Sequence, residues 1–262
     1  MKSRLELARE GFEKGNIGLS KKAHELKKIK AKEEHKKGGE YLGDFVFGAI
    51  DGSITTFAVV SGVAGAALSN SIVLILGFAN LFADGFSMAI GNYLSSKSDI
   101  EFVKKERERE EWEVKHFPEG EIEEIKEIYK KKGLKGKELE AVVKAITSDK
   151  KLWVDTMISE ELGLVNEPKN PVKSALFTFI AFVFVGFIPL LSYVLSYFIE
   201  GIKEIVYPVS ITLTAAAFFF IGSAKVFLTG KKWWKSGFET LLIGGAAAVI
   251  AYAVGYFLKG LA

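Results

Sequence analysis

Carboxylates lie inside two long apolar stretches of the sequence, where an ionised side chain is energetically costly. Asp44 and Asp51 lie two helical turns apart in the first stretch, on one helix face. In the second stretch Asn80, Asp84 and Met88 recur every four residues and form a stripe. At about 1.5 Å per residue, Asp51 and Met88 would both lie about 12 Å below the same membrane surface, so a carboxylate and a thioether can meet there.

A carboxylate at that depth favours an ion or proton pathway that faces the interior of a helix bundle. The simpler interpretation is an Asp that only caps or hydrogen-bonds a neighbouring helix. For Asp44, which is close enough to the interface to stay hydrated, both interpretations are open. For Asp51 the pathway is the favoured one.

A second set of possible ligands lies in the charged segment that separates the apolar stretches. Its members form pairs spaced three or four residues apart, so each pair projects from one helix face. The pairs are Glu110 and Glu113, Glu121 and Glu124, and Met157 and Glu161. Antiparallel packing across the break at Pro118 would bring the first two pairs together. The alternative is that each Glu only belongs to a solvated face shared with Lys.

The chemistry of this set indicates a particular class of metal. Four or five carboxylate oxygens with one soft thioether sulfur suit a borderline divalent ion such as Fe²⁺. A thioether disfavours Mg²⁺ and Ca²⁺, which prefer oxygen ligands. The chain has no cysteine, so a disulfide framework and a thiolate metal site are both excluded.

The distribution of charge predicts a membrane protein. Of the 262 residues 49% are hydrophobic and 26% are charged, and the mean hydropathy is +0.20. The charged residues concentrate before Glu40 and between Asp99 and Lys169, whereas a soluble domain would interleave them. Five apolar segments are each long enough to cross a bilayer. They are residues 43–68, 72–96, 172–198, 205–228 and 236–258.

We therefore predict an all-α membrane protein with five transmembrane helices and a cytoplasmic helical-bundle insert between the second and the third. The predicted parts are a basic arm (1–40), two spans (41–97), the insert (98–170) and three further spans (171–262). In the insert, the second span is expected to continue as a charged helix to Lys115, followed by helices over 119–132, 137–147 and 149–162. Lys-rich connections place the N-terminus and the insert in the cytoplasm and the C-terminus outside.

The basic arm predicts a lipid partner rather than a nucleic acid. Its lysines between residues 21 and 37 have no aromatic residues interleaved with them, and the arm leads directly into a membrane helix. An anionic lipid surface is therefore the expected neighbour.

Several segments resemble the vacuolar iron transporters and their prokaryotic relatives. They are residues 51–57 (DGSITTF), 61–66 (SGVAGA), 83–88 (ADGFSM), 91–94 (GNYL), 152–155 (LWVD), 161–164 (ELGL) and 186–191 (GFIPLL). The similarity covers nearly all of the chain after Tyr41, in order and with the family's spacing. It implies a five-span homodimer that exchanges Fe²⁺ for protons along a path at the dimer interface.

The resemblance also implies roles for individual residues. The intramembrane metal ligands would be Asp51 and Met88. The ligands of the cytoplasmic domain would be Glu110, Glu113, Glu121, Glu124, Met157 and Glu161. The chain departs from the plant members at Asn80, where they carry a glutamate. Asp84 would take over the role of that glutamate in binding protons or metal.

The predicted function is export of Fe²⁺, or of Mn²⁺, from the cytoplasm in exchange for protons, with no enzymatic activity and no permanent cofactor. The membrane would be the cell membrane in a prokaryote and the vacuolar membrane in a eukaryote. The alternative from another class is a membrane-anchored di-iron ferroxidase, which needs two Glu-x-x-His motifs. The segment from Glu113 to His116 is the one match among three histidines. A receptor or scaffold would leave the buried Asp residues unexplained.

Overall fold

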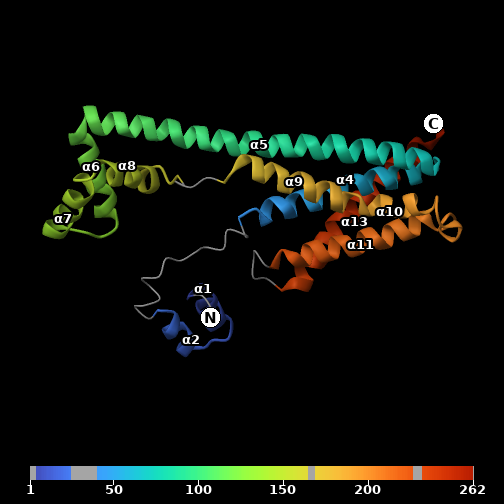
Figure 1. The fold of residues 1–262 in the computed structure, drawn as a ribbon, viewed down its shortest axis with the longest axis horizontal. Coiled ribbons are helices and arrows are strands. Elements are labelled where there is room, and N and C mark those ends of the chain that lie inside the picture. The colour runs from blue at the N-terminus through green and yellow to red at the C-terminus, as the bar shows by residue number, and fades with distance from the viewer. Residues whose placement is uncertain (1–3, 25–39, 165–168, 227–231, 262) are drawn as a thin grey trace. The chain divides into compact units, whose positions relative to one another are not determined.

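The computed structural model describes residues 4–24, 40–164, 169–226 and 232–261, and every regular element within them is a helix (Figure 1). The chain divides into two compact units, residues 1–40 and 41–262. In the first unit α1 (Arg4–Glu13) and α2 (Ile17–Ala23) form a helical pair. Gly15 makes the turn with a φ of +58°, and the Asn16 side chain caps α2. The described part of the predicted basic arm is thus helical, and the lysines between residues 27 and 37 lie outside the described residues.

The apolar part of the second unit is a bundle of long helices. They are α4 (Leu42–Gly65), α5 (Asn70–His116), α9 (Pro171–Gly186), α10 (Ile188–Leu195), α11 (Val206–Ala224) and α13 (Trp233–Leu258). Among the described residues, four helices are long and apolar enough to cross a membrane: α4, α5, α11 and α13 with its short extension. The pair α9 and α10 brings this number to five if it forms one bent span.

The third predicted span, residues 172–198, is not one straight helix. The structure breaks it between Gly186 and Ile188, and the two halves meet at 42°. The physical cause is Pro189, which has no backbone N–H to continue the helical ladder and whose ring clashes with the preceding turn. The Ser210 hydroxyl of α11 donates to the Pro189 carbonyl at 2.6 Å, so a polar group at the break is satisfied by a neighbouring helix.

The core of the bundle forms around α4, which packs against α9, α13 and α5. Its buried apolar residues include Phe57 and Val60, which belong to a cluster with Leu81, Phe182 and Phe218. Glycines allow the helix backbones to approach closely. A Cβ on Gly48 would lie 2.3 Å from the Thr178 carbonyl oxygen, and one on Gly52 would lie 2.5 Å from that of Phe182.

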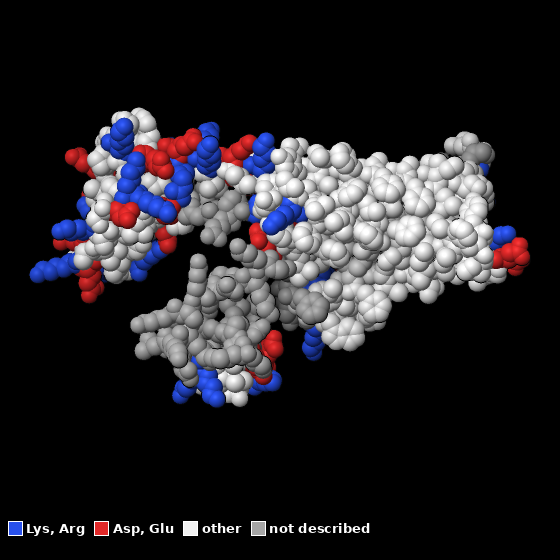
Figure 2. Space-filling model, viewed as in Figure 1, with Lys and Arg blue, Asp and Glu red and all other residues white. Residues whose placement is uncertain are grey.

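The charged insert begins as a continuation of α5, which runs for 47 residues without a break. It continues with α6 (Pro118–Lys131), α7 (Gly136–Thr147), α8 (Lys150–Thr156) and the π-helix η2 (Met157–Glu161). The helix predicted over 149–162 is therefore an α-helix that ends in a π-turn, and Asp149 caps its start. Figure 2 shows charged side chains gathered over the insert and a nearly uncharged surface over the apolar helices.

The close approach of α4 and α9 generates a stability prediction. Gly48→Ala places a methyl group inside contact distance of the α9 backbone, so the helices must separate. We expect the free energy of unfolding in detergent to fall by about 1–3 kcal/mol, the usual range for overpacking. Gly245→Ala is the matched control, because a Cβ at Gly245 has no atom within 4 Å. Equal melting temperatures for the two variants would contradict this packing.

Candidate metal centre

Three carboxylates converge where α5 reverses into α6. One oxygen from each of Glu110, Glu113 and Glu121 lies within 4.8 Å of the others. The first two residues lie on α5 and the third on the first turn of α6. The sequence folds this way because Pro118 cannot continue α5 but suits the start of a helix.

Two of the three carboxylates are buried, and each has an oxygen without a hydrogen-bond partner among the described residues. Glu110 is 0% exposed and Glu121 is 5% exposed. Oε1 of Glu110 pairs with the Arg109 guanidinium at 2.7 Å, whereas Oε2 of Glu110 and Oε2 of Glu121 have no hydrogen-bond partner among the described residues. Burying a carboxylate in this way is costly unless it is protonated or paired with a cation. The arrangement therefore leaves oxygen donors available for a cation.

The electrostatics of the cluster follow from its burial and its like charges. Burial raises the pKa of Glu110 to about 7, Arg109 opposes the shift, and Glu161, Glu113 and Glu124 reinforce it. Burial also raises the pKa of Glu121 to about 7, reinforced by Glu124, Glu110, Glu113 and Glu161. The five glutamates proposed as ligands from the sequence thus lie close enough to repel one another.

Met157 lies in the apolar core of the insert and Glu161 at its edge. Met157 is fully buried and packs in a cluster with Val114, Ile125 and Ile158, whereas Glu161 is exposed. The two residues begin and end the π-helix, in which the Leu162 N–H donates to the Met157 carbonyl at 3.2 Å. Isolated π-turns occur often at functional sites. The predicted role of Met157 as a sulfur ligand stays a prediction.

The intramembrane residues lie on two helices that pack together. Asp51 is on α4, while Asn80, Asp84 and Met88 are on α5, and all four are half-buried. Asp51 and Asp84 therefore lie on helices that are in contact. Met88 packs against the apolar core, and the buried Asn80 amide nitrogen has no acceptor within the described residues. Joint binding by Asp51 and Met88 stays a prediction.

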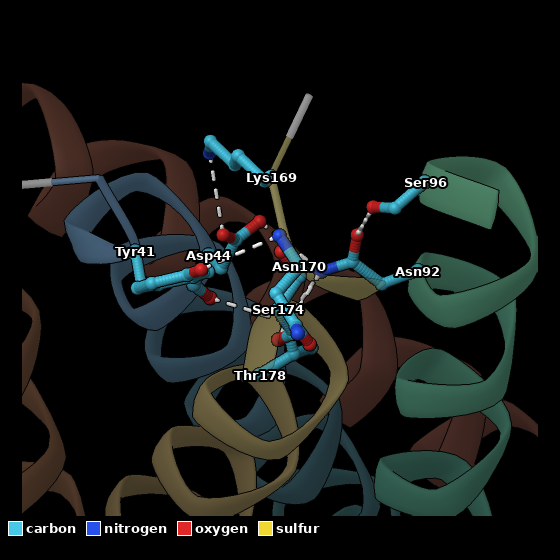
Figure 3. Close-up of polar contacts among 8 residues, drawn as sticks. All are labelled: Tyr41, Asp44, Asn92, Ser96, Lys169, Asn170, Ser174 and Thr178. Atoms are coloured by element: carbon cyan, nitrogen blue, oxygen red, sulfur yellow. Dashed lines mark hydrogen bonds and ion pairs between the residues drawn. The ribbon is translucent and has the colours of Figure 1, made fainter. Parts of the chain in front are cut away.

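Asp44 lies in a polar network that joins three helices (Figure 3). Its Oδ1 accepts a hydrogen bond from the Asn92 amide of α5 at 3.1 Å, and its Oδ2 pairs with Lys169 at 3.3 Å. The same Asn92 amide donates to the Thr178 hydroxyl of α9 at 2.7 Å. Of the two interpretations left open by the sequence, these contacts favour hydrogen bonding to neighbouring helices. Sequence reasoning missed Asn92, although it continues the four-residue stripe one step beyond Met88.

Comparison with known proteins identifies the group to which these features belong. Residues 42–256 match the model of the VIT family. The chain is 35% identical to the vacuolar iron transporter of Toxoplasma gondii, with 97% of this chain and 88% of that protein covered. It is 38% identical to vacuolar iron transporter 1 of Arabidopsis thaliana, with 85% and 88% covered, and 34% identical to the vacuolar iron transporter of Plasmodium berghei, with 98% and 97% covered.

The chain belongs to the VIT family. The matched region includes both groups of predicted ligands, those of the insert and those of α4 and α5. The VIT relatives are named as transporters, which agrees with the prediction that the chain is not an enzyme.

The ferroxidase alternative finds no support at its one matching motif. His116 is the last residue of α5, and its ring stacks on Trp112 with the ring centroids 4.4 Å apart. Its Nδ1 lies 2.7 Å from the Trp112 carbonyl, a contact in which the nitrogen must donate. This histidine therefore completes a helix end, and the VIT relatives are not named as oxidases.

The raised pKa values of Glu110 and Glu121 predict a pH-dependent stability. Between about pH 4.5 and pH 7 the folded protein binds more protons at these two sites than the unfolded chain does. Its free energy of unfolding must therefore fall as the pH rises through this window. We expect faster amide hydrogen exchange in α6, corrected for intrinsic rates, at about pH 8 than at about pH 5.5 with a chelator present.

The control for this measurement is Glu110→Gln combined with Glu121→Gln, because glutamine does not titrate. The corrected exchange rates of the double variant should change much less between the two pH values. The same pH dependence in both proteins would show that other groups are responsible.

Proposed function

We propose that this protein is an integral membrane transporter that exports Fe²⁺ from the cytoplasm in exchange for protons, with Mn²⁺ as the second candidate ion. The names of its VIT relatives support the class of substrate. The apolar helices support a path across a lipid bilayer. The observation that carries the proposal is the buried cluster of Glu110, Glu113 and Glu121, whose oxygens converge within 4.8 Å.

The insert acts in this proposal as the part that collects the metal. A divalent cation between α5 and α6 would bind the unpaired Oε2 atoms of Glu110 and Glu121 and compensate their burial. The remaining ligands would be Glu113, Glu124, Glu161 and Met157. Because bound carboxylates must be deprotonated, metal binding at about pH 7 releases protons from this cluster.

The path through the bundle uses the acids of α4 and α5. Asp51 and Met88 would bind the travelling ion. This chain has Asn80 where the plant members have a glutamate, so Asp84 would supply the missing negative charge. Asp44, which is bound by Asn92 and Lys169, would hold neighbouring helices together at the end of the path rather than bind the ion. Protonation of these carboxylates competes with metal binding, and that competition couples the two fluxes.

The proposed assembly is a homodimer with five spans in each chain, the third of them bent at Pro189. Lys-rich connections orient the N-terminus and the insert toward the cytoplasm, and anionic lipids would bind the basic arm.

Metal binding to the insert tests the first half of the proposal. Purified full-length protein titrated with Mn²⁺, which resists oxidation by air, should bind the ion in a calorimeter. Glu110→Gln or Glu121→Gln removes a charged ligand, so affinity should fall by more than the roughly 10–100-fold that loss of an outer-shell partner costs. Glu123→Gln is the matched control, because this residue lies on α6 but points to solvent and pairs with Lys126. Equal losses for the three variants would refute the site.

Transport through the bundle tests the second half. In proteoliposomes with a pH gradient, Asp51→Asn keeps the side-chain volume but removes the charge, so Fe²⁺ uptake should fall to near the background of empty liposomes. Glu239→Gln, an exposed carboxylate of α13, should transport like the parent protein. Uptake by Asp51→Asn equal to that of the parent would remove Asp51 from the mechanism.

A further inference from the structure

A cation already occupies part of the glutamate cluster. Arg109 lies on α5 beside Glu110, and its guanidinium contacts three carboxylates. Its Nη2 lies 2.7 Å from Oε1 of Glu110, its Nη1 2.5 Å from Oε2 of Glu113, and its Nε 2.9 Å from Oε2 of Glu106. Two of these partners are proposed metal ligands and the third, Glu106, is not.

A metal ion and this guanidinium compete for the same positions. A divalent ion binds carboxylate oxygens at about 2.0–2.2 Å, so it would lie where the Nη atoms now approach Glu110 and Glu113. Two cations at such a separation in a partly buried site repel each other strongly. One must leave when the other arrives.

The exposure of the side chains decides which group moves. The Glu110 side chain is 1% exposed and held within the insert, whereas the Arg109 side chain is 42% exposed and can swing toward solvent. Glu106 offers the guanidinium a second binding position. It lies three residues earlier on the same helix, and its side chain is 19% exposed. Arg109 can therefore give up Glu110 and Glu113 and remain paired with Glu106.

We propose that Arg109 is a positioning residue that pairs with the carboxylates of the proposed metal site as a placeholder cation and is displaced onto Glu106 when a divalent metal binds. This inference rests on the proposed function of the glutamate cluster and adds its regulation. The exchange keeps the charge of the buried carboxylates compensated in both states. It also weakens metal binding, because every arriving ion must displace the guanidinium, and this favours release of the ion from the cluster.

The test compares the Mn²⁺ affinity of full-length variants in detergent by calorimetry. Arg109→Gln removes the competitor, so binding should tighten by about 10–100-fold, the range expected for hydrogen bonds between charged groups. Lys126→Gln removes the same charge from a partly exposed position on α6 and should change affinity by less than about fivefold. Equal effects of the two substitutions would overturn the proposal, because they would reflect net charge alone.

A double-mutant cycle tests the second position of the guanidinium. Glu106→Gln should weaken Mn²⁺ binding in the parent background, since the displaced Arg109 then has no partner, and should have a much smaller effect in the Arg109→Gln background. Identical effects in the two backgrounds would refute displacement onto Glu106.

These outcomes separate the inference from the function on which it rests. If the parent binds Mn²⁺ and Glu110→Gln abolishes binding, but Arg109→Gln behaves like Lys126→Gln, only the placeholder role fails. If the parent binds no Mn²⁺, both fail.

Discussion

The unbroken backbone hydrogen bonding of α5 is the constraint on which the rest of the second unit depends. Its 47 residues correspond to about 70 Å of continuous helix, and such a helix satisfies its own polar backbone groups both in an apolar environment and in water. The apolar half packs against α9, α4 and α10, and the charged half against α6, α8 and the π-helix. One rigid element therefore carries Asp84 and Met88 as well as Glu110 and Glu113, so the two groups of proposed ligands share a backbone.

The fold of the insert holds the glutamate cluster in an energetically unfavourable arrangement. Like charges at Glu110 and Glu121 are buried in the insert, where desolvation and repulsion raise their pKa values to about 7. Protons and Arg109 relieve this repulsion, and in the proposed function a divalent metal relieves it as well. A site with three alternative occupants of positive charge suits a protein that must bind an ion and then release it.

Small and polar residues hold the helices of the bundle together. Gly48 and Gly52 bring α4 against α9, while Asn92 and Lys169 hold Asp44 at the end of these helices. Close backbone packing and hydrogen bonds replace the hydrophobic effect, which does not drive helix association within lipid. The bend at Pro189 lies next to this contact, because Gly186 packs on the Gly52 carbonyl.

The sequence by itself determined the elements and the two groups of chemically capable residues. Apolar length predicted the helices from α4 to α13, and helical spacing placed Glu110 with Glu113 and Asp84 with Met88, because both properties depend on residues close in the chain. Only the tertiary structure decided which side chains are buried and what they contact. It buried Glu110 and left Glu124 exposed, bent the third span at Pro189, paired Asp44 with Asn92 and Lys169, and set Arg109 across two proposed ligands. These outcomes depend on how separate helices pack, and the spacing within one helix contains no information about its neighbours.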